Sequence, residues 1–146
     1  MSEEKINKKD KQETINVLQD KIIIDGENAI LGRLASYSAK QALLGKKVII
    51  VNSEKVVVSG NRKSIIQDYL EKRKFKKVKF PSVPEQILKR TVRGMLSYKQ
   101  GRGEQALKRV MCYKGIPQEF ENEKKIKSGR EKKGLMSLED LSKMLK

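Results

Sequence analysis

The chain has 146 residues, about the length of one domain, and carries 34 Lys and Arg side chains against 18 Asp and Glu, a formal charge of +16. With one Cys, no His and no Trp, it excludes a disulfide scaffold, nearly excludes a Cys/His zinc site, and lacks the general base that enzymes use most often. Such a charge favours a polyanionic partner, with nucleic acid ahead of an anionic membrane surface or a merely soluble basic protein.

The first 20 residues are polar and nearly balanced in charge, so we expect residues 1–20 to form a flexible tail. No apolar core follows Met1 that would suit a signal peptide, and no apolar run approaches the ~20 residues that span a bilayer. The single Cys fits a reducing compartment. The sequence therefore predicts a cytoplasmic protein with no membrane partner.

Two β-branched runs flank an amphipathic helix. Lys21–Asp25 and Lys47–Asn52 are short and uninterrupted, as buried strands are. Between them, apolar side chains recur every three or four residues from Leu31 to Leu44, and Gly45 ends the pattern, which predicts a helix. A third short strand is expected over 55–60. Continuous rather than alternating Val and Ile runs indicate a sheet that is covered on both faces.

Beyond residue 60 the pattern is mainly helical. We expect one helix over 64–74 and another over 85–96, the second opened by Pro84. A third helix over 104–109 leads into a fourth short strand over 110–113. These elements complete a single basic α/β domain, with no internal repeat.

Two local patterns complete the expected elements. Gly101–Gly103 combines two glycines with an arginine, which predicts a flexible basic turn. Near the end of the chain, Ser137 precedes an amphipathic run and Asp140 follows three residues later. This capping-box-like arrangement predicts a short terminal helix with Ser137 as its N-cap.

The positive charge is concentrated in one part of the chain. Residues 71–115 hold fourteen basic and three acidic side chains, so this segment carries eleven of the sixteen excess charges. A local basic field of this kind suits a phosphate backbone. In the densest part, Phe75, Val78 and Phe80 interrupt six cations. These apolar residues either anchor the segment to the domain, which we favour, or contact bases and riboses.

The motifs of common enzyme classes are incomplete. The loop from Gly26 to Gly32 lies between a strand and a helix, where phosphate-binding loops occur, but it lacks both the P-loop ending and the Gly-x-Gly-x-x-Gly pattern. The acidic residues have no metal-ligand spacing. Cys112 lies in an apolar run with no His to activate it, which favours packing over nucleophilic chemistry.

Three separated stretches of the sequence match one known family. The first is Ile24–Gly26 followed by Leu31–Ser36, and the second is Gly45–Val56 followed by Ser59–Gly60. The third joins four short pieces, which are Val92–Leu96, Gly101–Gly103, Ala106–Val110 and Tyr113–Gly115. In order and spacing they resemble the universal large-subunit ribosomal protein L13 family, in its archaeal or eukaryotic branch. Ser97 departs from the proline that many members have after Gly-Met-Leu.

The resemblance implies a three-layer α/β/α fold around a mostly parallel, four-stranded, Rossmann-like sheet, with basic extensions. Residues 21–120 would form one RNA-binding domain, and 121–146 a charged C-terminal extension with a short terminal helix. The family has no catalytic activity and no cofactor. It binds large-subunit ribosomal RNA beside other large-subunit proteins and supports assembly and stability of that subunit in the cytoplasm. No small-molecule substrate is expected.

The candidate RNA-binding residues are cations and two glycines. Arg102 and Arg109 suit bidentate phosphate contacts. Gly94 and Gly101–Gly103 would let the backbone approach RNA closely, and Arg33 either faces RNA or forms a structural ion pair. Met95 and Leu96 are expected in the core. The full set is Arg33, Lys46, Arg62, Lys72, Arg73, Lys74, Lys76, Lys77, Lys79, Lys89, Arg90, Arg93, Gly94, Lys99, Arg102, Gly103, Lys108 and Arg109.

Two alternatives remain open from the sequence. A free-standing RNA- or DNA-binding regulator could use the same domain. A small α/β enzyme acting on phosphorylated or nucleotide substrates is the other alternative, and it would be stabilised thermally by nucleotides.

Overall fold

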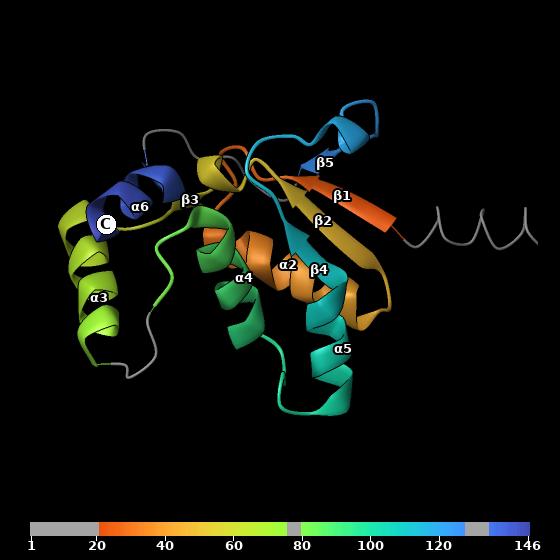
Figure 1. Cartoon of the computed structure of the whole chain (residues 1–146), viewed down its shortest axis with the longest axis horizontal. Coiled ribbons are helices and arrows are strands. Elements are labelled where there is room, and N and C mark those ends of the chain that lie inside the picture. Colours follow the sequence, from red (N-terminus) through yellow and green to blue (C-terminus); the bar gives the residue numbers. More distant parts are fainter. Residues whose placement is uncertain (1–20, 76–79, 128–134) are drawn as a thin grey trace, which may run out of the picture.

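The fold is built on a parallel sheet. The computed structural model describes residues 21–75, 80–127 and 135–146, so the tail expected over 1–20 lies outside the described residues. Four strands lie in the order β4-β2-β1-β5, and every neighbouring pair is parallel (Figure 1). They are β1 (Lys21–Asp25), β2 (Lys47–Val51), β4 (Val110–Cys112) and β5 (Ile126–Lys127).

Side chains on both faces of this sheet are buried, because successive residues of a strand point to opposite sides. Ile24 and Ile50 belong to the main hydrophobic core. Ile23 and Ile49 point the other way and pack with Phe120, from a 3₁₀ helix, in a smaller cluster. The expected three-layer α/β/α fold with a mostly parallel four-stranded sheet is confirmed, with one outer layer much thicker than the other.

Three helices form the thick layer. They are α2 (Leu31–Leu43), α4 (Pro84–Gly94) and α5 (Gly101–Arg109), and their apolar faces share the main core with the sheet. Helix α3 (Arg62–Phe75) lies beside α6 (Leu138–Leu145) at the other end of the molecule (Figure 1). The helices expected from the sequence are confirmed to within three residues at each end, and proline opens α4 as predicted.

The strand pairing differs from expectation in two places. The third expected strand is β3 (Val57–Val58), which pairs antiparallel with β6 (Met136–Ser137) in a separate two-stranded ribbon. The fourth strand of the central sheet is instead β5, which the sequence did not predict. Strands of two residues are too short to have a visible period, so tertiary contacts decide where they pair.

The C-terminal segment packs into the main core. The Ser137 side chain accepts a hydrogen bond from the Asp140 backbone N–H at 3.2 Å, which confirms the predicted N-cap of α6. Leu138, Leu141 and Leu145 of α6 are at most 1% exposed. Residues 135–146 therefore contribute buried apolar surface to the domain.

Substitution of a buried leucine in α6 tests this packing. Leu141→Ala should lower the free energy of unfolding by about 2–5 kcal/mol, because it leaves a cavity in the core. Met144→Ala, on the exposed side of the same helix, should change it by less than about 0.5 kcal/mol. Urea unfolding measures both. Equal, small effects would contradict the docking of α6.

Candidate nucleic-acid interface

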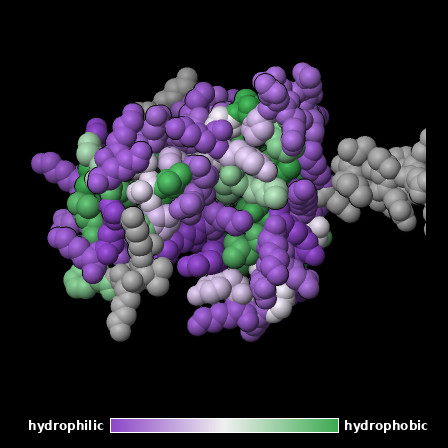
Figure 2. All heavy atoms as spheres, viewed as in Figure 1, coloured by the Kyte–Doolittle hydropathy of each residue, from purple (hydrophilic) through white to green (hydrophobic). Residues whose placement is uncertain are grey.

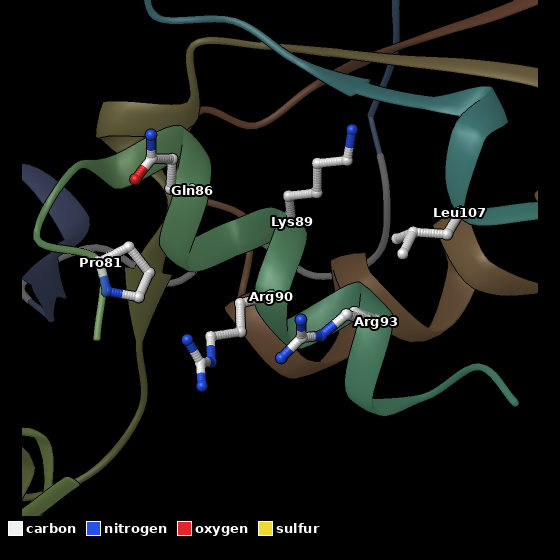
Figure 3. A pocket seen from close by; sticks show the side chains of 6 residues that line it. All are labelled: Pro81, Gln86, Lys89, Arg90, Arg93 and Leu107. Carbon is white, nitrogen blue, oxygen red and sulfur yellow. The ribbon is translucent and has the colours of Figure 1, made fainter. Parts of the chain in front are cut away.

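Helix α4 has one apolar face and one cationic face. Ile87, Leu88 and Val92 are at most 1% exposed and pack in the main core. Lys89 and Arg93 project from the other side of the helix, as the 3.6-residue period requires (Figure 3). Burial of the three apolar side chains therefore fixes the direction in which Lys89 and Arg93 point.

Aromatic rings hold the two arginines of this face. The Arg90 guanidinium carbon lies 4.7 Å from the ring centroid of Phe80, and that of Arg93 lies 5.0 Å from the ring centroid of Tyr98. Phe80 is itself buried and packs edge-on against Tyr69, with ring centroids 5.6 Å apart. A guanidinium held over a ring keeps its N–H groups available at its edge for a second partner.

A solvent-open groove runs along the cationic face of α4. Its volume is ≈ 380 Å³. Its lining residues are Pro81, Gln86, Lys89, Arg90, Arg93 and Leu107 (Figure 3). Three cations and no carboxylate line it, so the groove attracts anions. The face of the molecule that Figure 2 shows is largely hydrophilic.

The predicted flexible turn at Gly101–Gly103 is wrong, because α5 begins at Gly101. Gly103 is buried, and a Cβ built on it would collide with the carbonyl of Ser97 and lie 3.0 Å from the Tyr98 nitrogen. Contact within the protein therefore accounts for a glycine at this position. Gly94 and Gly101 face open space.

The cations on and beside α5 have different surroundings. Lys99 and Arg102 are exposed. Lys108 is also exposed but forms an ion pair with Glu104 at 3.0 Å. Arg109 is half-buried, and its Nη1 donates a hydrogen bond of 3.3 Å to the carbonyl of Ala42 at the end of α2. One N–H group of the Arg109 guanidinium therefore already has a hydrogen-bond partner within the protein.

The cations at the end of α3 form a second group. Lys72 and Lys74 are exposed and Arg73 is half-buried. The Lys72 ammonium lies 4.7 Å from the ring centroid of Tyr69. The structure describes no position for Lys76, Lys77 or Lys79, so these candidates lie outside the described residues.

Three further candidates lie on other elements. Arg33 is exposed in the first turn of α2 and forms no ion pair within the described ranges, which leaves the structural alternative without support there. Lys46 is half-buried just beyond the opposite end of α2. Arg62 is exposed at the start of α3. The structure does not gather these three at one place.

The expectations for the apolar residues near the cations are met in part. Phe80 anchors its segment as expected, and Leu96 is in the core at 6% exposure. Phe75 is 84% exposed and Met95 is 45% exposed, so anchoring of the first and core packing of the second are wrong. Both lie at or just past the end of a helix, where a side chain projects beyond the packed face. Val78 lies outside the described residues.

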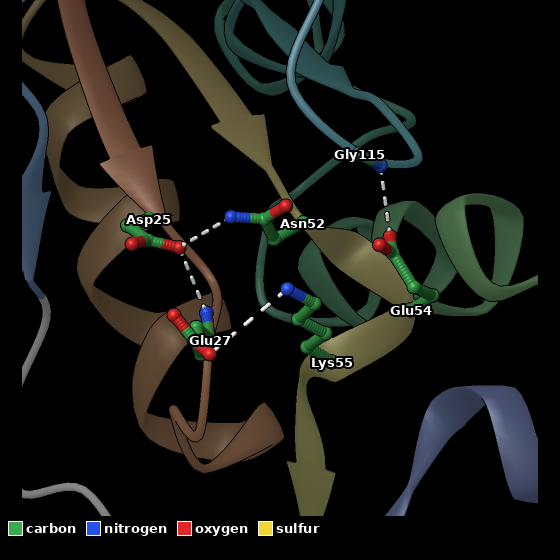
Figure 4. A network of polar contacts seen from close by, with 6 residues as sticks. All are labelled: Asp25, Glu27, Asn52, Glu54, Lys55 and Gly115. Carbon is green, nitrogen blue, oxygen red and sulfur yellow. Dashed lines mark hydrogen bonds and ion pairs between the residues drawn. The ribbon is translucent and has the colours of Figure 1, made fainter.

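The carboxyl ends of the parallel strands, where α/β enzymes bind ligands, hold a set of internal hydrogen bonds (Figure 4). Asp25 Oδ1 accepts from the Glu27 backbone N–H at 3.0 Å and from the Asn52 amide at 2.9 Å. Glu54 Oε2 accepts from the Gly115 N–H at 2.9 Å. These polar groups tie together the loops that follow β1, β2 and β4.

Cys112 is half-buried in β4. Burial raises the pKa of its thiol to about 12, with the Lys89 ammonium opposing and the Glu85 carboxylate adding to the rise. Cys112 is therefore a neutral thiol at physiological pH. In the parts of the chain that the structure describes, no group of three metal-ligating side chains occurs, and no helix is long and apolar enough to cross a membrane.

Sequence reasoning found the three cations of α4 but not the rings that orient two of them. Phe80 precedes Arg90 by ten residues, and Tyr98 follows Arg93 across the end of the helix. No local period connects such pairs. The available signal was the presence of aromatic residues within a basic segment of a chain that has few of them.

A cationic groove on a parallel α/β domain is typical of nucleic-acid-binding proteins. The sequence profile of the family described as "Ribosomal protein L13" matches residues 19–119 of this chain. The chain belongs to this family, which confirms the resemblance noted in the sequence.

Curated relatives agree with the archaeal branch. A protein of Methanocaldococcus jannaschii is 44% identical over 131 residues, covering 84% of this chain and 96% of its own length. One from Thermoplasma volcanium is 40% identical over 131 residues with the same two shares, and one from Methanosarcina barkeri is 45% identical over 109 residues, with 71% and 78%. All three carry the name "Large ribosomal subunit protein uL13".

Two glycines in the first turn of α5, one packed against the Ser97 backbone and one facing open space, can each be replaced by alanine. Gly103→Ala should lower the free energy of unfolding by about 1–3 kcal/mol, because its Cβ must displace the backbone of Ser97. Gly101→Ala, in open space, should leave stability unchanged or raise it by up to about 1 kcal/mol. Thermal unfolding measures both, and a neutral Gly103→Ala would contradict the contact.

The reactivity of Cys112 tests its environment. At pH 8 the folded protein should react with iodoacetamide roughly 100- to 1000-fold more slowly than the urea-unfolded chain, because the raised pKa keeps the thiol protonated. The rate in the folded state should keep increasing up to the pKa of about 12. A plateau near pH 9 would contradict the raised pKa of the Cys112 thiol.

Proposed function

We propose that this protein is a structural constituent of the large ribosomal subunit that binds large-subunit ribosomal RNA through the basic surface around α4, and that it supports assembly and stability of the subunit. Its place of action is then the cytoplasmic ribosome, beside neighbouring large-subunit proteins. The role is one of binding rather than catalysis. Membership of the ribosomal protein L13 family and the names of its relatives support the ribosomal part of the proposal.

The observation that carries RNA binding is the cationic face of α4. Lys89, Arg90 and Arg93 line one groove, and no carboxylate lies among the lining residues. An Arg guanidinium presents parallel N–H donors that match two phosphate oxygens, and Lys supplies a mobile charge. Three cations spread over more than one turn of α4 suit several phosphates of an RNA better than a single small anion.

Four of the remaining candidate cations are proposed to extend this surface. Lys99 and Arg102, just before and within α5, and Lys72 and Lys74, at the end of α3, are all exposed. Contacts of this type neutralise phosphates and follow the shape of an RNA, and they carry little information on sequence. We therefore expect recognition of a folded ribosomal RNA through its backbone.

The salt dependence of binding tests this surface. The pair Lys89→Gln and Arg93→Gln should weaken binding to in vitro transcribed large-subunit RNA and reduce the slope of log K against log salt by about 2, roughly one per lost phosphate contact. Filter binding over a range of KCl concentrations measures the slope.

The control pair is Lys124→Gln and Lys143→Gln, two exposed residues outside the proposed surface, with the same change in net charge. Its slope should stay close to that of the unaltered protein. Equal slopes for the two pairs would show that binding follows net charge alone and would contradict the assignment to α4.

Sedimentation distinguishes a ribosomal constituent from a free-standing RNA-binding regulator. A constituent should co-sediment with large subunits through moderate salt washes. A regulator should leave the subunits in the same washes, which would contradict the proposal while leaving RNA binding intact.

A further inference from the structure

Phe75 is the most exposed large apolar side chain within the described residues, at 84%. It ends α3, directly after Lys72, Arg73 and Lys74. Tyr69, Phe80 and Tyr98 each lie against a ring or a cation, whereas no ring or cation in the described ranges lies against Phe75. The fold thus leaves this ring open to a partner.

The ring borders a shallow hollow with a mixed lining. The hollow has a volume of ≈ 290 Å³ and is formed by Asp68, Glu71, Lys72 and Phe75. Glu71 accepts one hydrogen bond from Gln67 at 3.3 Å through Oε1. Asp68 makes no hydrogen bond or ion pair through its side chain in the described part of the chain. An apolar ring, two carboxylates and an ammonium therefore meet at one exposed place.

We infer that Phe75 is a stacking platform for one unpaired RNA base and that the base it prefers is guanine; this inference rests on the proposed function. Aromatic side chains bind splayed-out bases of single-stranded RNA by stacking, and neighbouring groups read the base edge. Guanine presents two adjacent kinds of donor, N1–H and N2–H₂, and carboxylates are acceptors. The Lys72 ammonium, which also lines the hollow, would bind the phosphate next to that base.

The other bases fit the hollow less well. Adenine and cytosine each present a ring-nitrogen lone pair beside their amino group, and that lone pair repels a carboxylate. Uracil presents one N–H between two carbonyl oxygens. The carboxylates of Asp68 and Glu71 therefore give the site a reason to select guanine, whereas the Phe75 ring stacks on any base.

Charge favours RNA over a protein as the occupant. Three cations, Lys72, Arg73 and Lys74, directly precede the ring in the last turn of α3, beside the carboxylates of Asp68 and Glu71. A protein partner would need an apolar pocket for the ring and a strongly acidic rim around it. RNA brings a flat apolar face and a phosphate backbone together in every nucleotide.

The absence of Trp from the chain provides a direct probe. In full-length Phe75→Trp, the new indole should be strongly quenched when a uridine nonamer with one central guanosine binds, because stacking quenches indole fluorescence. The same nonamer with central adenosine, cytidine or uridine should quench less at equal concentration. Leu44→Trp, at a residue 63% exposed beyond α2, is the control and should not respond.

Affinity measurements complete the test. Phe75→Ala should bind the guanosine nonamer roughly 5- to 150-fold more weakly, the range for loss of one stacked base. Phe75→Tyr should restore binding. The pair Asp68→Asn and Glu71→Gln should lose the preference for guanosine over adenosine without losing affinity for the all-uridine nonamer.

The outcomes separate this inference from the proposed function. One outcome is that Phe75→Trp is not quenched and Phe75→Ala binds RNA as the unaltered protein does, while the Lys89→Gln and Arg93→Gln pair still lowers the salt slope. In that case the stacking site is wrong and the assignment of RNA binding to α4 is retained. If Phe75→Ala instead weakens only the association of the RNA-bound protein with large-subunit proteins, Phe75 is a protein contact and the inference is overturned. If no RNA binds at all, both proposals fail.

Discussion

The rest of the structure depends on the burial of one face of α4. Ile87, Leu88 and Val92 are fixed in the main core against α2. Because the helix is rigid and turns by about 100° per residue, fixing these three side chains fixes where Lys89 and Arg93 point. The same packing places the groove between α4 and α5 and sets the direction of the loop that joins the two helices.

The cationic surface carries a cost that its surroundings reduce. Like charges on neighbouring turns repel, and repulsion lowers the stability of the free protein. Phe80 and Tyr98 lie against the guanidinium groups of Arg90 and Arg93, which offsets part of that repulsion and restricts the side chains before any partner binds. Less conformational entropy is then lost when phosphate arrives. A surface of mobile lysines would lack this advantage.

Much of the fold could be predicted because its main elements have strong local signals in the sequence. The runs that form β1 and β2, the stripe of α2 and the cap of α6 are each visible locally. Strands of two residues, such as β5, have no period, and their pairing depends on contacts distant in sequence. Gly103 illustrates the same limit, since a glycine pair predicts a turn unless the contact with Ser97 is known.

The same limit applies to the candidate site, where only residues with a local signal in the sequence could be predicted. Three cations of α4 could be assigned to one face from helical spacing alone, because the neighbouring apolar positions define the other face. Apolar residues are expected inside by default, so the exposure of Phe75 and Met95 could not be predicted. Both follow an amphipathic stretch, and only the packed structure shows where that stretch stops being covered.

Quantitative acetylation of lysines in the protein alone and bound to large-subunit RNA, measured by mass spectrometry, tests the central claim most directly. Lys89 should be modified readily in the free protein, where it is exposed, and should be protected in the complex. Lys124, also exposed, should react equally in both. Protection of Lys124 with continued modification of Lys89 would contradict the assignment of the RNA surface to α4.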